Sequence, residues 1–216
     1  MFLGHLAVGF AVKRATPRVN LATLFAAAQF PDLLWPLLVA VGVERVEIAP
    51  GITAFTPLDF VSYPWSHSLI LVVIWGAVFA VMHFLRSRNG VAAGVLAMLV
   101  VSHWVLDYVS HRPDLPIYPG SARYGLGLWN SVAATIAVEA VLFVIGAWLY
   151  AQATRPRDGR GQFAFASLVG VLILGYVGNI LAAPPSVDAI WSGALVGALL
   201  LLAWAAWADR NRVSVS

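Results

Sequence analysis

The strongest chemical signal in the sequence is a histidine followed four residues later by an aspartate, His103 and Asp107, in the run SHWVLD. On a helix this spacing puts both side chains on one face. There an imidazole nitrogen and a carboxylate oxygen can bind one metal ion, although the pair also suits a plain hydrogen bond. His111 continues the same phase, while Pro113 predicts that the helix ends near it.

Four other ionisable side chains stand in apolar stretches, and each also has a simpler interpretation. His5 and His67 suit histidines at a membrane interface, and His67 also suits the start of a helix. Asp32 follows a proline, so it suits a kinked helix whose carboxylate is satisfied by a neighbouring helix. Glu139 lies four residues after Thr135, which suits a hydrogen bond between the two side chains.

The composition indicates that these residues lie in a membrane. Apolar residues make up 61% of the 216 residues and charged residues only 11%, whereas about a quarter of a soluble domain is charged. We expect an all-α bundle of about six transmembrane helices, preceded by a short N-terminal helix within the first twelve residues. The expected spans are Leu21–Val43, His67–Leu85, Val91–Val109, Leu128–Ala151, Ala164–Ala183 and Ala189–Ala208.

Burial in a bilayer makes these ionisable residues costly. One ionisable group at the centre of a membrane costs roughly 2.5–3.5 kcal/mol on insertion scales. Several of them in one bundle should therefore face inward and meet one another, a cation or water. The absence of cysteine excludes thiolate ligands and disulfides, so nitrogen and oxygen ligands remain.

The charge distribution predicts the orientation of the bundle. Loops expected on one side hold ten Lys and Arg residues, against three on the other side. We therefore expect a protein of the cell (inner) membrane. The positive-inside rule predicts that both termini lie in the cytoplasm and that the site opens to the outer face. His5 conflicts with this arrangement unless the N-terminal segment dips into the bundle. We interpret the net charge of +3 as a topology signal and expect no nucleic-acid partner.

We expect one membrane-embedded domain over residues 1–216. Residues 1–150 contain the ionisable residues of the spans, and residues 151–216 form two glycine-rich scaffold helices.

The order of the motifs resembles a known family. A Gly-His-Leu at residue 4, a Pro-Asp, a Ser-His-Ser-Leu, a His–x3–Asp and a Gly-Leu-Gly-Leu-Trp-Asn followed by a glutamate occur within residues 1–150. This set resembles the YdjM-like family of predicted inner-membrane metal-dependent hydrolases, thought to be distantly related to zinc-dependent phospholipase C. The resemblance implies as metal ligands His5, Asp32, His67, His103, Asp107 and Glu139.

One departure from the soluble relatives affects the number of metals. Those enzymes use a His–x3–Glu pair late in the site, whereas this chain has Thr135 before Glu139. One imidazole is therefore missing from a three-metal cluster, and His111 is a candidate replacement.

The leading hypothesis is a metal-dependent hydrolase acting on a phosphoester of a lipid or lipid-linked substrate. Zn²⁺ is the first expectation, with Mn²⁺ or Fe²⁺ as alternatives. His67, His103 and Asp107 would hold one metal, and His5 would help to complete a second position. Asp32 and Glu139 are the expected catalytic carboxylates. The alternatives are a cation or proton transporter and a structural membrane protein whose polar residues only join helices.

Overall fold

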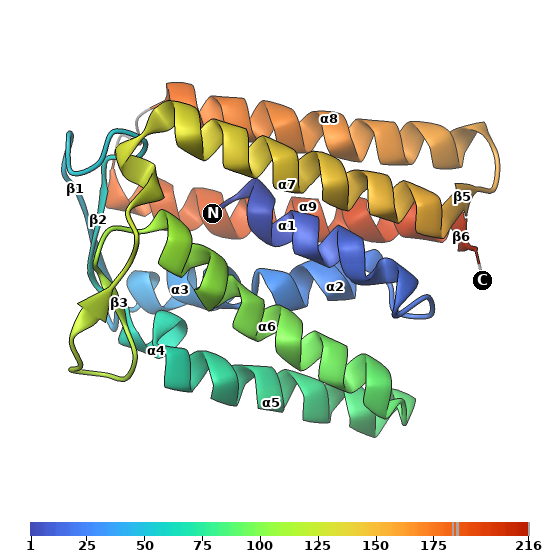
Figure 1. Ribbon diagram of the computed structural model, residues 1–216, viewed down its shortest axis with the longest axis horizontal. Helices are drawn as coiled ribbons and strands as arrows, with labels where there is room; N and C mark the ends of the chain where they lie inside the picture. Colours follow the sequence, from blue (N-terminus) through green and yellow to red (C-terminus); the bar gives the residue numbers. More distant parts are fainter. Residues whose placement is uncertain (183, 185, 216) are drawn as a thin grey trace.

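The computed structural model describes residues 1–182, 184 and 186–215, and it is a bundle of helices (Figure 1). Its helices are α1 (Leu3–Ala11), η1 (Val12–Arg14), α2 (Leu21–Ala28), α3 (Phe30–Ala40), α4 (Pro64–His67), α5 (Leu69–Ser87), α6 (Gly90–Ser110), η2 (Leu128–Asn130), α7 (Val132–Ala153), α8 (Gly159–Leu181) and α9 (Val187–Arg210). Three antiparallel pairs of short strands close the ends: β1 (Arg45–Ile48) with β2 (Leu58–Ser62), β3 (Leu115–Pro116) with β4 (Arg123–Tyr124), and β5 (Thr154–Pro156) with β6 (Arg212–Ser214).

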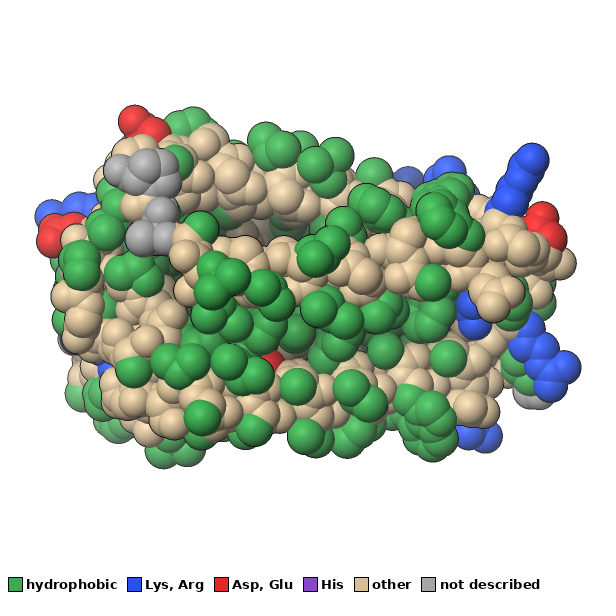
Figure 2. Space-filling view, turned by 90° about the horizontal axis from the view of Figure 1, so that it is seen from above, with side chains coloured by type: hydrophobic (Ala, Val, Ile, Leu, Met, Phe, Trp, Pro, Cys, Tyr) green, Lys and Arg blue, Asp and Glu red, His purple; other side chains and the backbone are tan. Residues whose placement is uncertain are grey.

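The expected all-α membrane bundle is confirmed. Helices α5 to α9 are each long and apolar enough to cross a bilayer, and the bent pair of α2 and α3 brings the number of spans to as many as six. The shortest of the five, α5, has 19 residues, which gives a length of roughly 28 Å at 1.5 Å per residue. Figure 2 shows hydrophobic side chains spread over the middle of one face of the bundle.

The expected span over Leu21–Val43 is broken rather than only kinked. The chain breaks at Gln29, and α2 and α3 meet at an angle of 60°. Pro31 lies in the first turn of α3, where its missing N–H is tolerated, whereas inside one long helix it would remove a hydrogen bond. The break leaves the carbonyl oxygen of Ala28 free to accept a hydrogen bond from the ring of His103. The break therefore provides a backbone acceptor for the ring of His103.

Helix α1 lies inside the bundle, between α6 and α7 in Figure 1. Its Leu6 and Phe10 are fully buried. Gly146 of α7 lets the helices approach closely, since a Cβ built there would lie 2.4 Å from the carbonyl oxygen of Ala7. The N-terminal segment thus dips into the bundle. Met1 is buried beside Asp107. This residue therefore lies within the bundle and not at its basic end.

The two ends of the bundle differ in charge. Lys and Arg side chains gather at the end where Figure 1 places β5 and β6 (Figure 2). At this end the buried Lys13 donates to Asp209 of α9 over 2.8 Å, and Tyr150 of α7 donates to the same carboxylate over 2.8 Å. Helix α9 is therefore tied by polar contacts to the N-terminal segment and to α7. The paired strands β1–β2 and β3–β4 lie at the opposite end.

Candidate metal centre

Four possible ligands from three helices converge near the end of the bundle that holds β1 to β4. Asp32 comes from α3, His67 from the last residue of α4, and His103 and Asp107 from α6. Nε2 of His67 lies 3.4 Å from Asp32 Oδ1 and 3.7 Å from Asp107 Oδ2. Nε2 of His103 lies 3.6 Å from the same Asp32 oxygen and 3.0 Å from the same Asp107 oxygen.

These separations match a metal-binding geometry. Two ligand atoms that are each about 2.0–2.1 Å from a tetrahedral zinc ion lie roughly 3.3 Å apart. The four nitrogen–oxygen distances, from 3.0 to 3.7 Å, lie within a few tenths of an ångström of that value. Ligand atoms of Asp32, His67 and His103 also all lie within 4.8 Å of one another. Asp32, His67 and His103 therefore fit one divalent ion with two nitrogen ligands and one oxygen ligand, and Asp107 lies beside them.

Hydrogen bonds on the far side of each ring favour the tautomer that binds a metal. Nδ1 of His103 lies 2.8 Å from the carbonyl oxygen of Ala28, which can only accept a hydrogen bond. Nδ1 therefore donates to this carbonyl, and Nε2 is the nitrogen that faces the carboxylates. This Nε2 atom is buried, as a ligand position requires. His67 is held in the same way through its Nδ1, 2.7 Å from Ser66 Oγ.

A second group consists of His5, His103 and Asp107, and it shares His103 with the first. Nε2 of His5 lies 3.0 Å from Asp107 Oδ1, the oxygen that faces away from His67. The ring of His5 stacks on that of His103, with centroids 3.7 Å apart and planes within 8°. The amino group of Met1 also lies 2.6 Å from Asp107 Oδ1. The Asp107 carboxylate thus lies between the first group and His5.

His111 approaches this second group from the other side. Its Nε2 lies 3.8 Å from Asp107 Oδ1, and its Nδ1 lies 3.0 Å from Asp114 Oδ1. The hydroxyl of Tyr63 donates to the same Asp114 oxygen over 2.6 Å. Burial and the neighbouring Asp114 carboxylate raise the pKa of Tyr63 well above its usual value, so this hydroxyl remains a donor. No local pattern in the sequence points to the roles of Tyr63 and Asp114.

Glu139 lies outside both groups, although it is fully buried. Its Oε2 accepts hydrogen bonds from the backbone N–H groups of Leu3 at 2.6 Å and Gly4 at 3.3 Å. The expected bond from Thr135 is absent, because that hydroxyl donates to the carbonyl oxygens of Leu128 and Ser131. Glu139 therefore holds the start of α1, the helix that carries His5.

The site is open at Asp32. The Asp32 side chain is 43% exposed, whereas those of His67, His103 and Asp107 are at most 3% exposed. Oδ1 of Asp32 faces the two imidazoles, and the described part of the chain makes no hydrogen bond or ion pair with Oδ2. A ligand can therefore approach from the side of this carboxylate.

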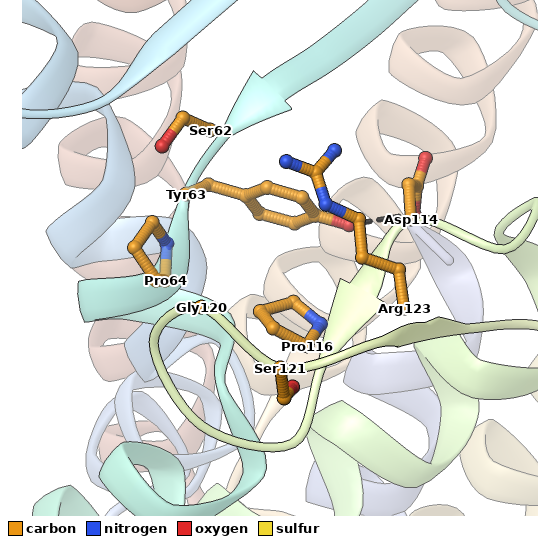
Figure 3. Close-up of a pocket in the computed structure, with 8 residues that line it drawn as sticks. All are labelled: Ser62, Tyr63, Pro64, Asp114, Pro116, Gly120, Ser121 and Arg123. Carbon is orange, nitrogen blue, oxygen red and sulfur yellow. Dashed lines mark hydrogen bonds between the residues drawn. The ribbon is translucent and has the colours of Figure 1, made fainter.

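A cavity of about 300 Å³, lined by both polar and apolar residues, lies beside the site, at the end that holds β1 to β4. Figure 3 shows Arg123 extending along the phenol of Tyr63, with Asp114 at the hydroxyl end of that ring. The guanidinium makes one hydrogen bond, to the carbonyl oxygen of Val61. Tyr63 in turn contacts the ring of His67, with centroids 5.0 Å apart. One side chain thus separates the cavity from the candidate ligands.

Comparison of the chain with protein-family models, curated proteins and solved structures gives no match. The function is therefore argued from the chemistry of the site.

Proposed function

We propose that this protein is a membrane-embedded metal-dependent hydrolase that cleaves a phosphoester of a lipid or lipid-linked substrate. The observation that carries the proposal is the convergence of Asp32, His67 and His103 on one position, with Asp107 beside them in a second group. Zn²⁺ suits imidazole and carboxylate ligands, and Mn²⁺ and Fe²⁺ are alternatives. The motif resemblance to YdjM-like hydrolases points to the same chemistry.

The position of Asp107 supports a second metal in the same site. Its Oδ2 faces His67 and His103, while its Oδ1 faces His5, with His111 nearby. A carboxylate with one oxygen toward each group can bridge two positions. A bound divalent ion supplies a Lewis acid for the phosphoryl oxygen and lowers the pKa of its water toward about 7.

Side chains of the protein would carry out the proton transfer and hold the ligands in place. Oδ2 of Asp32 is placed to accept the proton of the attacking water. The imidazoles are fixed as ligands by their outer hydrogen bonds. As the new bond from the water oxygen to phosphorus forms, the bond to the leaving alcohol breaks, and that alcohol takes a proton from solvent. Glu139 acts indirectly by holding α1.

The position of the site favours an amphipathic substrate. It lies within the apolar bundle, toward the end opposite the basic loops, which the positive-inside rule places at the outer face of a cell membrane. The cavity lined by Arg123 suits the charged head of such a substrate. Its apolar chains would remain in the bilayer.

The opposite end of the bundle argues against a conduit. Asp209 accepts hydrogen bonds from Lys13, Tyr150 and the backbone N–H of Leu21, so it ties four segments together there. A transporter for cations or protons needs polar access to both faces. A site open at one end is what an enzyme requires.

The test is hydrolysis of phospholipids in mixed micelles by the purified protein supplied with Zn²⁺ or Mn²⁺. We expect a metal-dependent release of a phosphorylated or alcohol product that Asp32→Asn lowers by a factor of 100 or more, about 2.7 kcal/mol of transition-state stabilisation. In parallel, metal flux is measured in proteoliposomes. Flux without hydrolysis would overturn the proposal in favour of a transporter.

A further inference from the structure

A buried glutamate lies behind His67, on the side away from the candidate metal site. Glu44 precedes β1 and is only 1% exposed. Its Oε1 accepts hydrogen bonds from the backbone N–H groups of Trp65 at 2.8 Å and Ser66 at 2.9 Å. Its Oε2 accepts a bond from the hydroxyl of Ser66 over 2.6 Å. Three donors thus converge on the two oxygens, and both oxygens act as acceptors.

The single proton of the Ser66 hydroxyl fixes the direction of the next bond. Ser66 Oγ lies 2.6 Å from Glu44 Oε2 and 2.7 Å from His67 Nδ1. Because the carboxylate can only accept, the hydroxyl donates to Glu44 and must accept from Nδ1–H of His67. His67 then carries its proton on Nδ1, and the lone pair of Nε2 faces Asp32 and Asp107.

We infer that Glu44 and Ser66 are positioning residues that hold His67 in its metal-binding tautomer. The inference rests on the proposed metal-dependent function, and it assigns a role to two residues from outside the ligand set. Hydrogen-bonded partners behind metal ligands typically change metal affinity by about 10–100-fold when they are removed. A residue that only capped the short helix α4 would affect folding but not the location of a ring proton.

Two substitutions separate these roles. Ser66→Ala removes the acceptor for Nδ1–H and leaves both tautomers of His67 available. Glu44→Gln has a larger effect, because an amide both accepts and donates. With the amide oxygen held by Trp65 and Ser66 N–H, the –NH2 group faces Ser66 Oγ. The hydroxyl then donates to His67 Nδ1, and the ring proton moves to Nε2, where it blocks metal binding.

The experiment is ¹⁵N NMR of metal-free protein labelled at histidine, with the His67 signals assigned by a His67→Gln variant. We expect the Nδ1–H tautomer in the wild type, a mixture in Ser66→Ala and the Nε2–H tautomer in Glu44→Gln. Zn²⁺ affinity, measured against a competing chelator, should fall about 10–100-fold in both variants. Ser66→Thr, which keeps the hydroxyl, should retain both properties. Glu47→Gln, at an exposed position of β1, is the matched control.

An Nε2–H tautomer in the wild type, or unchanged His67 signals in Ser66→Ala, would overturn the inference. If Glu44→Gln does not fold, the His67 signals of Ser66→Ala alone test the inference. The metal-free spectra also separate this inference from the proposed function. If the tautomers change as expected but the wild type binds no metal, the hydrogen-bond network stands and the metal-dependent function fails.

Discussion

The imidazole rings of His5 and His103 stack with their centroids 3.7 Å apart, although 98 positions separate the two residues in the chain. The contact exists because α1 enters the bundle and packs along α7. The N-terminal helix therefore forms one wall of the candidate metal centre. Its position should control metal binding, even though only one of its residues is a candidate ligand.

The close approach of α1 and α7 at Gly146 can be tested by adding one methyl group. In Gly146→Ala the new Cβ would lie 2.4 Å from the carbonyl oxygen of Ala7, so α1 must move. We expect a lower melting temperature and weaker Zn²⁺ binding. Gly175→Ala on α8, where no atom of the described residues lies within 4 Å of the added Cβ, is the control. It should keep or raise stability, by up to about 1 kcal/mol of helix propensity. Equal effects of the two substitutions would show that the approach is not tight.

The position of Glu139 predicts different effects for two substitutions. Glu139→Ala leaves the N–H groups of Leu3 and Gly4 without their acceptor. An unsatisfied buried donor costs about 1–3 kcal/mol, so the free energy of unfolding should fall by about that amount. Glu139→Gln keeps an accepting oxygen and should retain most of the stability and metal affinity. If Gln reduces metal binding as much as Ala does, the carboxylate is a ligand rather than a support for α1.

The basic end of the bundle is held by the buried pair of Lys13 and Asp209. Asp209→Asn removes the charge that balances Lys13, whose remaining partner is the carbonyl oxygen of Val19. Breaking one side of a buried ion pair costs about 3–5 kcal/mol, which unfolding in mixed detergent micelles can measure. Asp188→Asn, at an exposed position near the other end of α9, should change stability by less than about 0.5 kcal/mol. A similar small change at Asp209 would contradict this role for the pair.

The cavity beside Tyr63 predicts an effect on substrate binding. Arg123→Gln removes a guanidinium charge that makes one hydrogen bond to the backbone. We expect KM for an anionic phospholipid to rise several-fold while kcat and metal content stay near wild type, because the change affects binding of the head group. Arg88→Gln, in the loop between α5 and α6 at the basic end, is the matched control. A fall in kcat with unchanged KM would place Arg123 in the reaction itself.

Local patterns in the sequence predicted most of the helices. Apolar stretches of membrane length predicted α5 to α9, and Pro31 predicted a kink near Asp32. The full break at Gln29 exceeded that expectation. The i,i+4 spacing of His103 and Asp107 was sufficient to place both side chains on one face of α6. Such features depend on residues close together in the chain.

Long-range contacts set the remaining features of the site. The charge pattern predicted which loops share the basic end of the bundle. It also assigned Met1 to that end, because a charge pattern carries no information on the packing of α1 inside the bundle. Glu44 lies in a polar loop 22 positions before Ser66, and no local spacing links the two. The role of Glu139 depends on the backbone of α1, more than 130 positions away. The roles of these residues can be identified only from the packed arrangement of the helices.

The metal content of the purified protein tests the proposed function most directly. Tag-free protein in detergent should contain one or two equivalents of Zn, Mn or Fe by mass spectrometry, either as isolated or after reconstitution. The His103→Ala/Asp107→Ala double variant should fold and contain none, because it loses ligands from both groups. His83→Ala on α5, outside both groups, should retain the metal. A wild type without metal after reconstitution, or a folded double variant that retains it, would contradict the metal centre proposed here.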